Sequence, residues 1–112
     1  MRWLRCVTLL CLLDSCALVE QPTAELAVAR AAISDAESAG AADRAPAELA
    51  EARDRLAHAE AHSRLRHYDE ALAFAQEAEA NARLASLKAR ATAAEAAFRA
   101  AKGQSEEPTR AP

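Results

Sequence analysis

The chain has 112 residues, enough for one small domain and too few for two. Hydrophobic residues make up 52% of it and aromatic residues only 4%, because about three residues in ten are alanine, a composition typical of long helices and coiled coils. The 17 acidic and 14 basic residues are interspersed, which argues against nucleic-acid binding or attachment to a membrane through a basic patch.

The first residues have the pattern of an export signal. Two arginines, Arg2 and Arg5, precede the apolar run "CVTLLCLL", which extends from Cys6 to Leu13. A charged segment followed by a short apolar segment is typical of a signal peptide. The run is too short to span a bilayer, which takes about 20 apolar residues. We therefore expect residues 1–15 to be a signal peptide.

The signal peptide ends in "LDSC", which resembles a bacterial lipobox. Leu13 provides the aliphatic residue, Ser15 the small residue before the cleavage site, and Cys16 the cysteine that is lipidated. Asp14 departs from the small or aliphatic residues that the lipobox favours at that position. The resemblance implies that Cys16 carries a diacylglycerol and a further acyl chain such as palmitate, and two or more chains give stable anchoring. Ala17 stands where an aspartate would resemble an inner-membrane retention signal, so the outer membrane of a Gram-negative bacterium, on its periplasmic face, is the expected location.

The cysteines agree with this interpretation. All three, Cys6, Cys11 and Cys16, lie in the leader. Processing at Cys16 leaves only the lipidated cysteine, so neither a disulfide nor a thiolate metal site forms within the processed chain. Residues 16–22 are expected to be a tether.

Two similar amphipathic helices are expected next, over about 23–39 and 46–66. Pro22 and Pro46 are favourable at helix starts, and Gly40 is a natural stop. The second helix repeats the first at an offset of 23 residues, which suggests an internal duplication. The apolar faces are predicted from helical spacing; they are Leu26, Ala29, Ile33 and Ala36 in the first helix, and Leu49, Ala52, Leu56 and Ala59 in the second.

A longer third helix is expected over 69–102, with Asp69 as its N-cap and Gly103 as its stop. Residues 103–112 are expected to be a disordered tail. The fold is therefore predicted to be all-α, either a three-helix antiparallel bundle or a coiled-coil-like helical hairpin with a long third helix, and the whole helical domain covers 23–102. Part of the third helix must extend past the other two or pair with another molecule.

The sequence offers few large apolar side chains for a core. The burial of about a dozen such side chains falls short of the entropy cost of ordering about 80 residues, so alanine contacts and close helix approach must contribute. We expect a marginally stable domain with a protein partner or self-association, and a candidate interaction face at Leu84, Leu87 and Phe98. Glu-to-Arg pairs four residues apart are expected on exposed faces; they are Glu51 and Arg55, Glu60 and Arg64, Glu79 and Arg83, and Glu95 and Arg99.

The segment from "APAELAEARDRLAHAEAHSRLR" through "HYDEALAFAQEAEANARLASLKA", together with the earlier "PTAELAVARAAISDAESAGAADRAP", resembles the bacterial domain of unknown function family 4398. The resemblance covers about residues 22–101. It implies an exported helical lipoprotein of Gram-negative bacteria. Some members carry an OmpA-like peptidoglycan-binding domain after the helices, and that cell-wall contact is not carried over to this sequence. The stretch "RHYDEALAFAQEA" is also similar to half of a tetratricopeptide repeat.

No residue set points to catalysis, to a cofactor or to a small-molecule substrate. His58 and His62 lie four residues apart, but Glu60 falls at the wrong place for the H-E-x-x-H zinc pattern, and both histidines are predicted to point away from the Leu49 and Leu56 face. Asp69 is explained as a helix cap, and the serines lack a neighbouring base for triad chemistry. The expected sites are therefore lipidation at Cys16 and the interaction face, with no catalytic, cofactor-binding or metal residues.

The leading hypothesis is a lipid-anchored periplasmic protein that acts as a structural or protein-interaction module of the cell envelope and is not an enzyme. The alternative is a periplasmic carrier or chaperone that holds a client or lipid in a shallow apolar groove. The oligomeric state and the identity of the partner stay open at this point.

Overall fold

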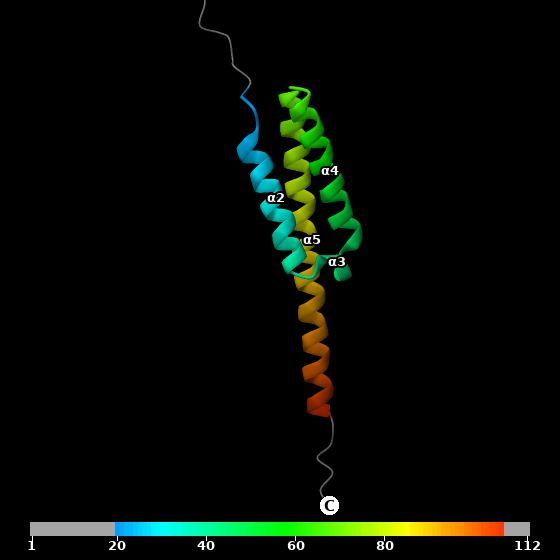
Figure 1. Cartoon of the computed structure of the whole chain (residues 1–112). Helices are drawn as coiled ribbons and strands as arrows, with labels where there is room; N and C mark the ends of the chain where they lie inside the picture. Colours follow the sequence, from blue (N-terminus) through cyan, green and yellow to red (C-terminus); the bar gives the residue numbers. More distant parts are fainter. Residues whose placement is uncertain (1–19, 107–112) are drawn as a thin grey trace, which may run out of the picture.

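The computed structural model describes residues 20–106, and these form an all-α bundle (Figure 1). The bundle comprises α2 (Thr23–Ser38), α3 (Ala41–Arg44), α4 (Pro46–Arg64) and α5 (Tyr68–Glu106). The described residues include no β-strand. The predicted fold class, an all-α bundle with a long C-terminal helix, is confirmed.

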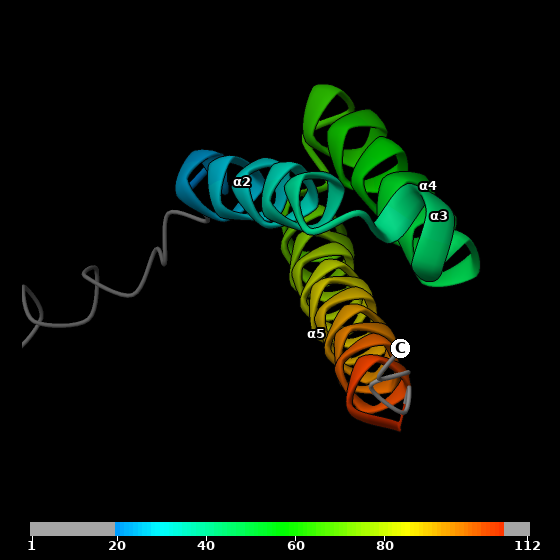
Figure 2. The ribbon, with the colours of Figure 1, turned by 90° about the horizontal axis from the view of Figure 1, so that it is seen from below.

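The three long helices, α2, α4 and α5, alternate in direction along the bundle. Arg30 of α2 pairs with Glu60 near the end of α4, whereas Glu37 near the end of α2 pairs with Arg53 near the start of α4, so α2 and α4 are antiparallel. The chain then reverses at the α4–α5 turn, and α5 runs back along both helices. Viewed along the bundle, α2 and α4 lie on either side of α5 (Figure 2).

The core consists mainly of alanine. Of the 15 buried hydrophobic residues, only Leu26, Ile33 and Leu49 are larger than alanine. The four residues predicted for the face of α2 are all buried, and so are Leu49, Ala52 and Ala59 of α4, while Leu56 is partly buried. Because an alanine side chain is a single methyl group, such a core forms only where helix backbones approach closely. On α5 the buried alanines recur at intervals of three or four residues; they are Ala71, Ala75, Ala78, Ala82, Ala85 and Ala89.

The connection after α2 forms a one-turn helix and contributes to the core. Gly40 adopts a left-handed conformation with φ of 84° and ends α2 as predicted. Its carbonyl oxygen then accepts hydrogen bonds from the amides of Asp43 and Arg44, which starts the one-turn helix α3. Ala41 and Ala45 are fully buried in this segment, so the connector also contributes to the core.

The turn between α4 and α5 is one residue longer than the sequence suggested, since it covers residues 65–67 rather than 67–68. Arg66 has a positive φ of 63°, its amide donates to the Ser63 carbonyl, and the amide of His67 donates to the His62 carbonyl. This is the Schellman pattern of helix ends, and it ends α4 at Arg64 rather than at residue 66. Helix α5 begins at Tyr68, so the prediction of Asp69 as its N-cap is wrong. Asp69 lies in the first turn instead, where its negative charge interacts favourably with the positive end of the helix dipole.

The predicted stop at Gly103 is wrong as well. Helix α5 continues through this residue to Glu106. Gly103 does not have a positive φ, and an exposed glycine within a helix costs only about 1 kcal/mol relative to alanine, which the flanking turns tolerate. The prediction of a disordered tail is therefore corrected for residues 103–106, and residues 107–112 lie outside the described residues.

Candidate interaction face

Helix α5 has two opposite faces. Its buried alanines face α2 and α4, whereas the three predicted interaction residues lie on the other side of the helix. Leu84 is 53% exposed, Leu87 is 64% exposed and Phe98 is 71% exposed. None of the three belongs to the buried clusters of the core, so the structure places all three on the surface.

These three side chains belong to a longer row. Reading along α5, exposed apolar residues recur at alternating intervals of four and three residues, the spacing of a coiled-coil seam. We call this row the outer stripe; it comprises Ala80, Leu84, Leu87, Ala91, Ala94, Phe98 and Ala101. Its four alanines were not predicted as site residues, although their spacing is visible in the sequence. Alanine is so abundant in this helix that almost any row of positions with this spacing contains several alanines. The outer stripe therefore does not stand out in the sequence.

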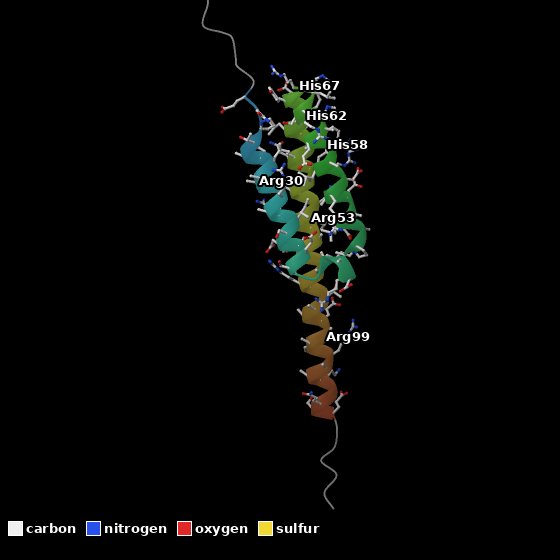
Figure 3. The ribbon with its side chains drawn as sticks, viewed as in Figure 1. Arg30, Arg53, His58, His62, His67 and Arg99 are labelled. Atoms are coloured by element: carbon white, nitrogen blue, oxygen red, sulfur yellow. The ribbon has the colours of Figure 1, made fainter. Side chains whose placement is uncertain are left out.

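The second half of the outer stripe lies beyond the bundle. Near the end of the bundle, Lys88 of α5 pairs with Glu48 of α4, and Arg90 pairs with Asp35 of α2. From Ala91 to Glu106, α5 extends alone, and only Ala93 is partly buried there (Figure 1). We call residues 91–106 the overhang; Arg99 projects from it without contact to α2 or α4 (Figure 3). The expectation that the long helix extends past the other two is met.

Charged side chains border the stripe where α5 leaves the bundle. The ammonium of Lys88 donates a hydrogen bond to a carboxylate oxygen of Glu48. This hydrogen bond lowers the pKa of Glu48 below its usual value, because it stabilises the ionised form. On the α2 side, Arg90 forms two hydrogen bonds to Asp35, which also accepts a hydrogen bond from the Ser86 hydroxyl at 3.0 Å. These contacts hold the flanks of α5 in fixed positions beside the stripe.

The four predicted Glu-to-Arg pairs are only partly realised. A guanidinium nitrogen of Arg55 lies 2.7 Å from a carboxylate oxygen of Glu51, and the hydrogen bond between the two side chains raises the pKa of Arg55. Ion pairs also form between Glu79 and Arg83 and between Glu95 and Arg99. Glu60 does not follow the pattern, since it accepts two hydrogen bonds from Arg30 of α2. Periodicity within one helix carries no information about this interhelical alternative.

The histidines gather at the end of the bundle that holds the α4–α5 turn (Figure 3). The His58 ring stacks on Phe74 of α5 at 5.3 Å between centroids, and His62 stacks on the same ring at 5.2 Å. The sequence predicted that both histidines point away from the Leu49 and Leu56 face. In the structure both rings pack on Phe74 of α5, which lies in the same cluster as Leu56. Within residues 20–106, no three His, Cys, Asp or Glu side chains converge as metal ligands would.

The pockets of the described residues are small, and charged side chains border them. One of about 220 Å³ lies between residues 20–25 and the start of α5, beside Tyr68 and Leu72. Another, of about 180 Å³, lies beside Leu87 and is lined by Asp35, Arg83, Ser86 and Arg90. Much of the lining of the second pocket is apolar, but the pocket is small and charged side chains surround it.

The predicted lipidation residue, Cys16, lies outside the described residues, as does the whole predicted signal peptide. Among residues 20–106, no helix is both long and apolar enough to cross a bilayer.

Comparison with protein families gives one match. The family model described as a domain of unknown function, DUF4398, matches residues 24–106. The chain belongs to this family. The match confirms the resemblance noted from the sequence and covers α2 to α5, including the overhang and the outer stripe. No curated protein and no solved structure matches the chain. The DUF4398 domain of this chain is thus a bundle with an alanine core and an apolar stripe on the outer face of its longest helix.

Proposed function

We propose that the chain is a lipoprotein of the Gram-negative outer membrane, anchored through Cys16, whose helical bundle faces the periplasm. In this proposal the bundle is a structural or protein-interaction module of the cell envelope and has no catalytic role. The leader and the lipobox-like segment support the location. The outer stripe supports the role.

The observation that carries the proposal is the exposure of Leu84, Leu87 and Phe98 on a helix that extends beyond its own bundle. Single exposed apolar residues are ordinary on protein surfaces, but a contiguous exposed apolar row is typical of an interaction site. The row has the spacing of a helix seam rather than the shape of a ligand pocket. A helix face recognised by another helix is therefore the interaction that fits it best.

The carrier or chaperone alternative stays a prediction that no specific observation favours. A carrier needs a concave apolar site, whereas the pockets described above are small and bordered by charged side chains. The outer stripe is a convex helix surface.

Lipidation is tested by labelling cells that express the full chain with radioactive palmitate. We expect label on the wild-type protein and on Cys11→Ser, and none on Cys16→Ser. The Cys11→Ser variant is the matched control, because it removes a leader thiol that lies outside the lipobox-like segment. Label that persists on Cys16→Ser, or its absence from the wild type, would refute the anchor. Separation of inner and outer membranes by density then locates the labelled protein.

The interaction role is tested with a photoreactive residue at Phe98 and, as a control, at Ala57, which is exposed on α4. Irradiation of intact cells should give a discrete adduct from position 98 and none from position 57. Equal adducts from both positions would show that the stripe has no special role.

A further inference from the structure

The outer stripe alternates large and small side chains in an order that makes it complementary to itself. Leu84 and Leu87 stand near one end, Ala91 and Ala94 in the middle, and Phe98 and Ala101 near the other end. If two α5 helices are placed antiparallel with the twofold axis between Ala91 and Ala94, each large residue meets a suitable neighbour. The layers are then Leu84 with Ala101 of the second copy, Leu87 with Phe98, and Ala91 with Ala94, each occurring twice.

The charges beside the stripe agree with the same alignment. Lys88 and Glu95 are seven residues apart and therefore lie on the same flank of the helix. In the antiparallel pair, Lys88 of each copy faces Glu95 of the other. Both side chains are available, since that of Lys88 is 52% exposed and that of Glu95 is 69% exposed. An ammonium has three donors, so Lys88 can keep its hydrogen bond to Glu48.

Neighbouring alignments bring like charges together. A shift of one heptad in one direction places Lys88 opposite Lys88 and Arg90 opposite Arg90. A shift in the other direction places Glu95 opposite Glu95 and Lys88 opposite Lys102. Like charges that face each other across a seam disfavour a register. Only the alignment described above avoids them while keeping the apolar layers filled.

A parallel pair is less favourable for the same reason. In parallel coiled coils a flanking residue faces the residue five positions later on the partner helix. Arg90 would then face Glu95, which is attractive, but Arg83 would face Lys88, which is repulsive. The antiparallel pair has no such conflict.

We propose that a second copy of this chain covers the outer stripe, through antiparallel pairing of two α5 helices over residues 84–101. The interface is isologous, as twofold symmetry requires. The overhang of each copy lies along the outer face of the other copy's bundle. The half of the stripe that lies on the overhang is therefore buried in both copies. This proposal rests on the proposed function, because it names the protein that binds the outer stripe.

The pairing also fixes where the two anchors lie. Residues 20–25 lie beside Tyr68 and Leu72 of the same copy. In the antiparallel pair these two ends are separated by about 60 to 75 Å along the helix axes, at 1.5 Å per residue. With both copies lipidated in one membrane, the dimer lies along the membrane surface rather than standing upright from it.

The alignment is tested by disulfide formation between introduced cysteines in the full chain, extracted from membranes in detergent. Leu87→Cys and Phe98→Cys are expressed separately and together. We expect a rapid disulfide dimer only when both variants are present, because residue 87 faces residue 98 and lies about 16 Å along the axis from residue 87 of the other copy. The chain without introduced cysteines controls for disulfides of its native cysteines. Rapid dimers from Leu87→Cys alone would overturn the antiparallel arrangement.

Association itself is measured by sedimentation in the same detergent. The wild-type chain should pass from monomer to dimer as concentration rises, and Glu95→Lys should weaken the dimer at least tenfold, because Lys88 then faces a lysine twice. Arg99→Glu is the matched control, since it also changes charge within the same exposed ion pair but lies outside the proposed interhelical contacts. Circular dichroism shows whether each variant is folded. A wild-type monomer at all concentrations, or equal effects of the two variants, would overturn the proposal.

These outcomes are distinct from those that test the proposed function. A discrete adduct between position 98 and a different envelope protein, with no dimer, would refute self-pairing and keep the interaction role. A dimer without palmitate on the chain would refute the anchor and keep self-pairing.

Discussion

Replacing Ala82 with leucine tests whether the bundle depends on the close approach of its helices. Ala82 is fully buried on the inner face of α5, in the same cluster as Ile33 of α2 and Leu49 of α4. Leucine adds three carbon atoms at a position where backbones of neighbouring helices lie near. Overpacking of a well-packed core costs typically about 1 to 3 kcal/mol. We expect the upper half of that range, about 2 to 3 kcal/mol, because α5 cannot move away from one helix without losing its contacts with both.

The assay is thermal unfolding of the full chain in detergent, followed by far-UV circular dichroism. For a domain of this size each 1 kcal/mol lowers Tm by about 4 to 8 °C, so Ala82→Leu should lower Tm by about 10 to 20 °C. The control is Ala57→Leu, the same substitution at an exposed position of α4, where only helix propensity changes and the shift should stay within about 2 °C. A Tm for Ala82→Leu equal to or above that of the wild type would refute the reasoning, since it would mean that the core holds unfilled space.

Two further predictions concern stability. The hydrogen bond from Lys88 lowers the pKa of Glu48 from its usual 4.5, so its stabilisation is fully present above about pH 4.5 and is lost as the pH falls through the lower pKa of the folded state. Urea unfolding of dilute protein should therefore show a stability difference between wild type and Lys88→Met that is constant near neutral pH and shrinks below pH 4.5; a difference that stays constant into acid would contradict the assignment. Arg66 holds a positive φ of 63° in the α4–α5 turn, a conformation that glycine adopts without its steric cost. Arg66→Gly should therefore stabilise the fold by about 0.5 to 1 kcal/mol and raise Tm, whereas an unchanged or lower Tm would show that the arginine side chain has a compensating contact.

Much of the fold follows from local properties of the sequence. The alanine content determines that the chain is helical. The prolines at positions 22 and 46 set where α2 and α4 begin, and the glycine at position 40 sets where α2 ends, because these residues act on the backbone conformation of their own neighbours. The apolar spacing of α2 determines which residues face inward. The candidate site is partly visible too, since Leu84, Leu87 and Phe98 are large apolar residues of the long helix that follow one another at helical spacing.

Other features depend on groups far apart in the sequence, and only the tertiary structure decided them. Helix periodicity assigns Glu60 to Arg64, but the packing of α2 against α4 brings Arg30 to Glu60 instead. The packing of α4 against α5 stacks His58 and His62 on Phe74. Beyond the bundle, α5 continues as a helix through Gly103. In an alanine-rich helix every face looks apolar, so the sequence by itself did not show which alanines of α5 are buried and which join Leu84, Leu87 and Phe98 on the outer face. The positions of α2 and α4 decide that, because burial depends on what lies opposite each side chain.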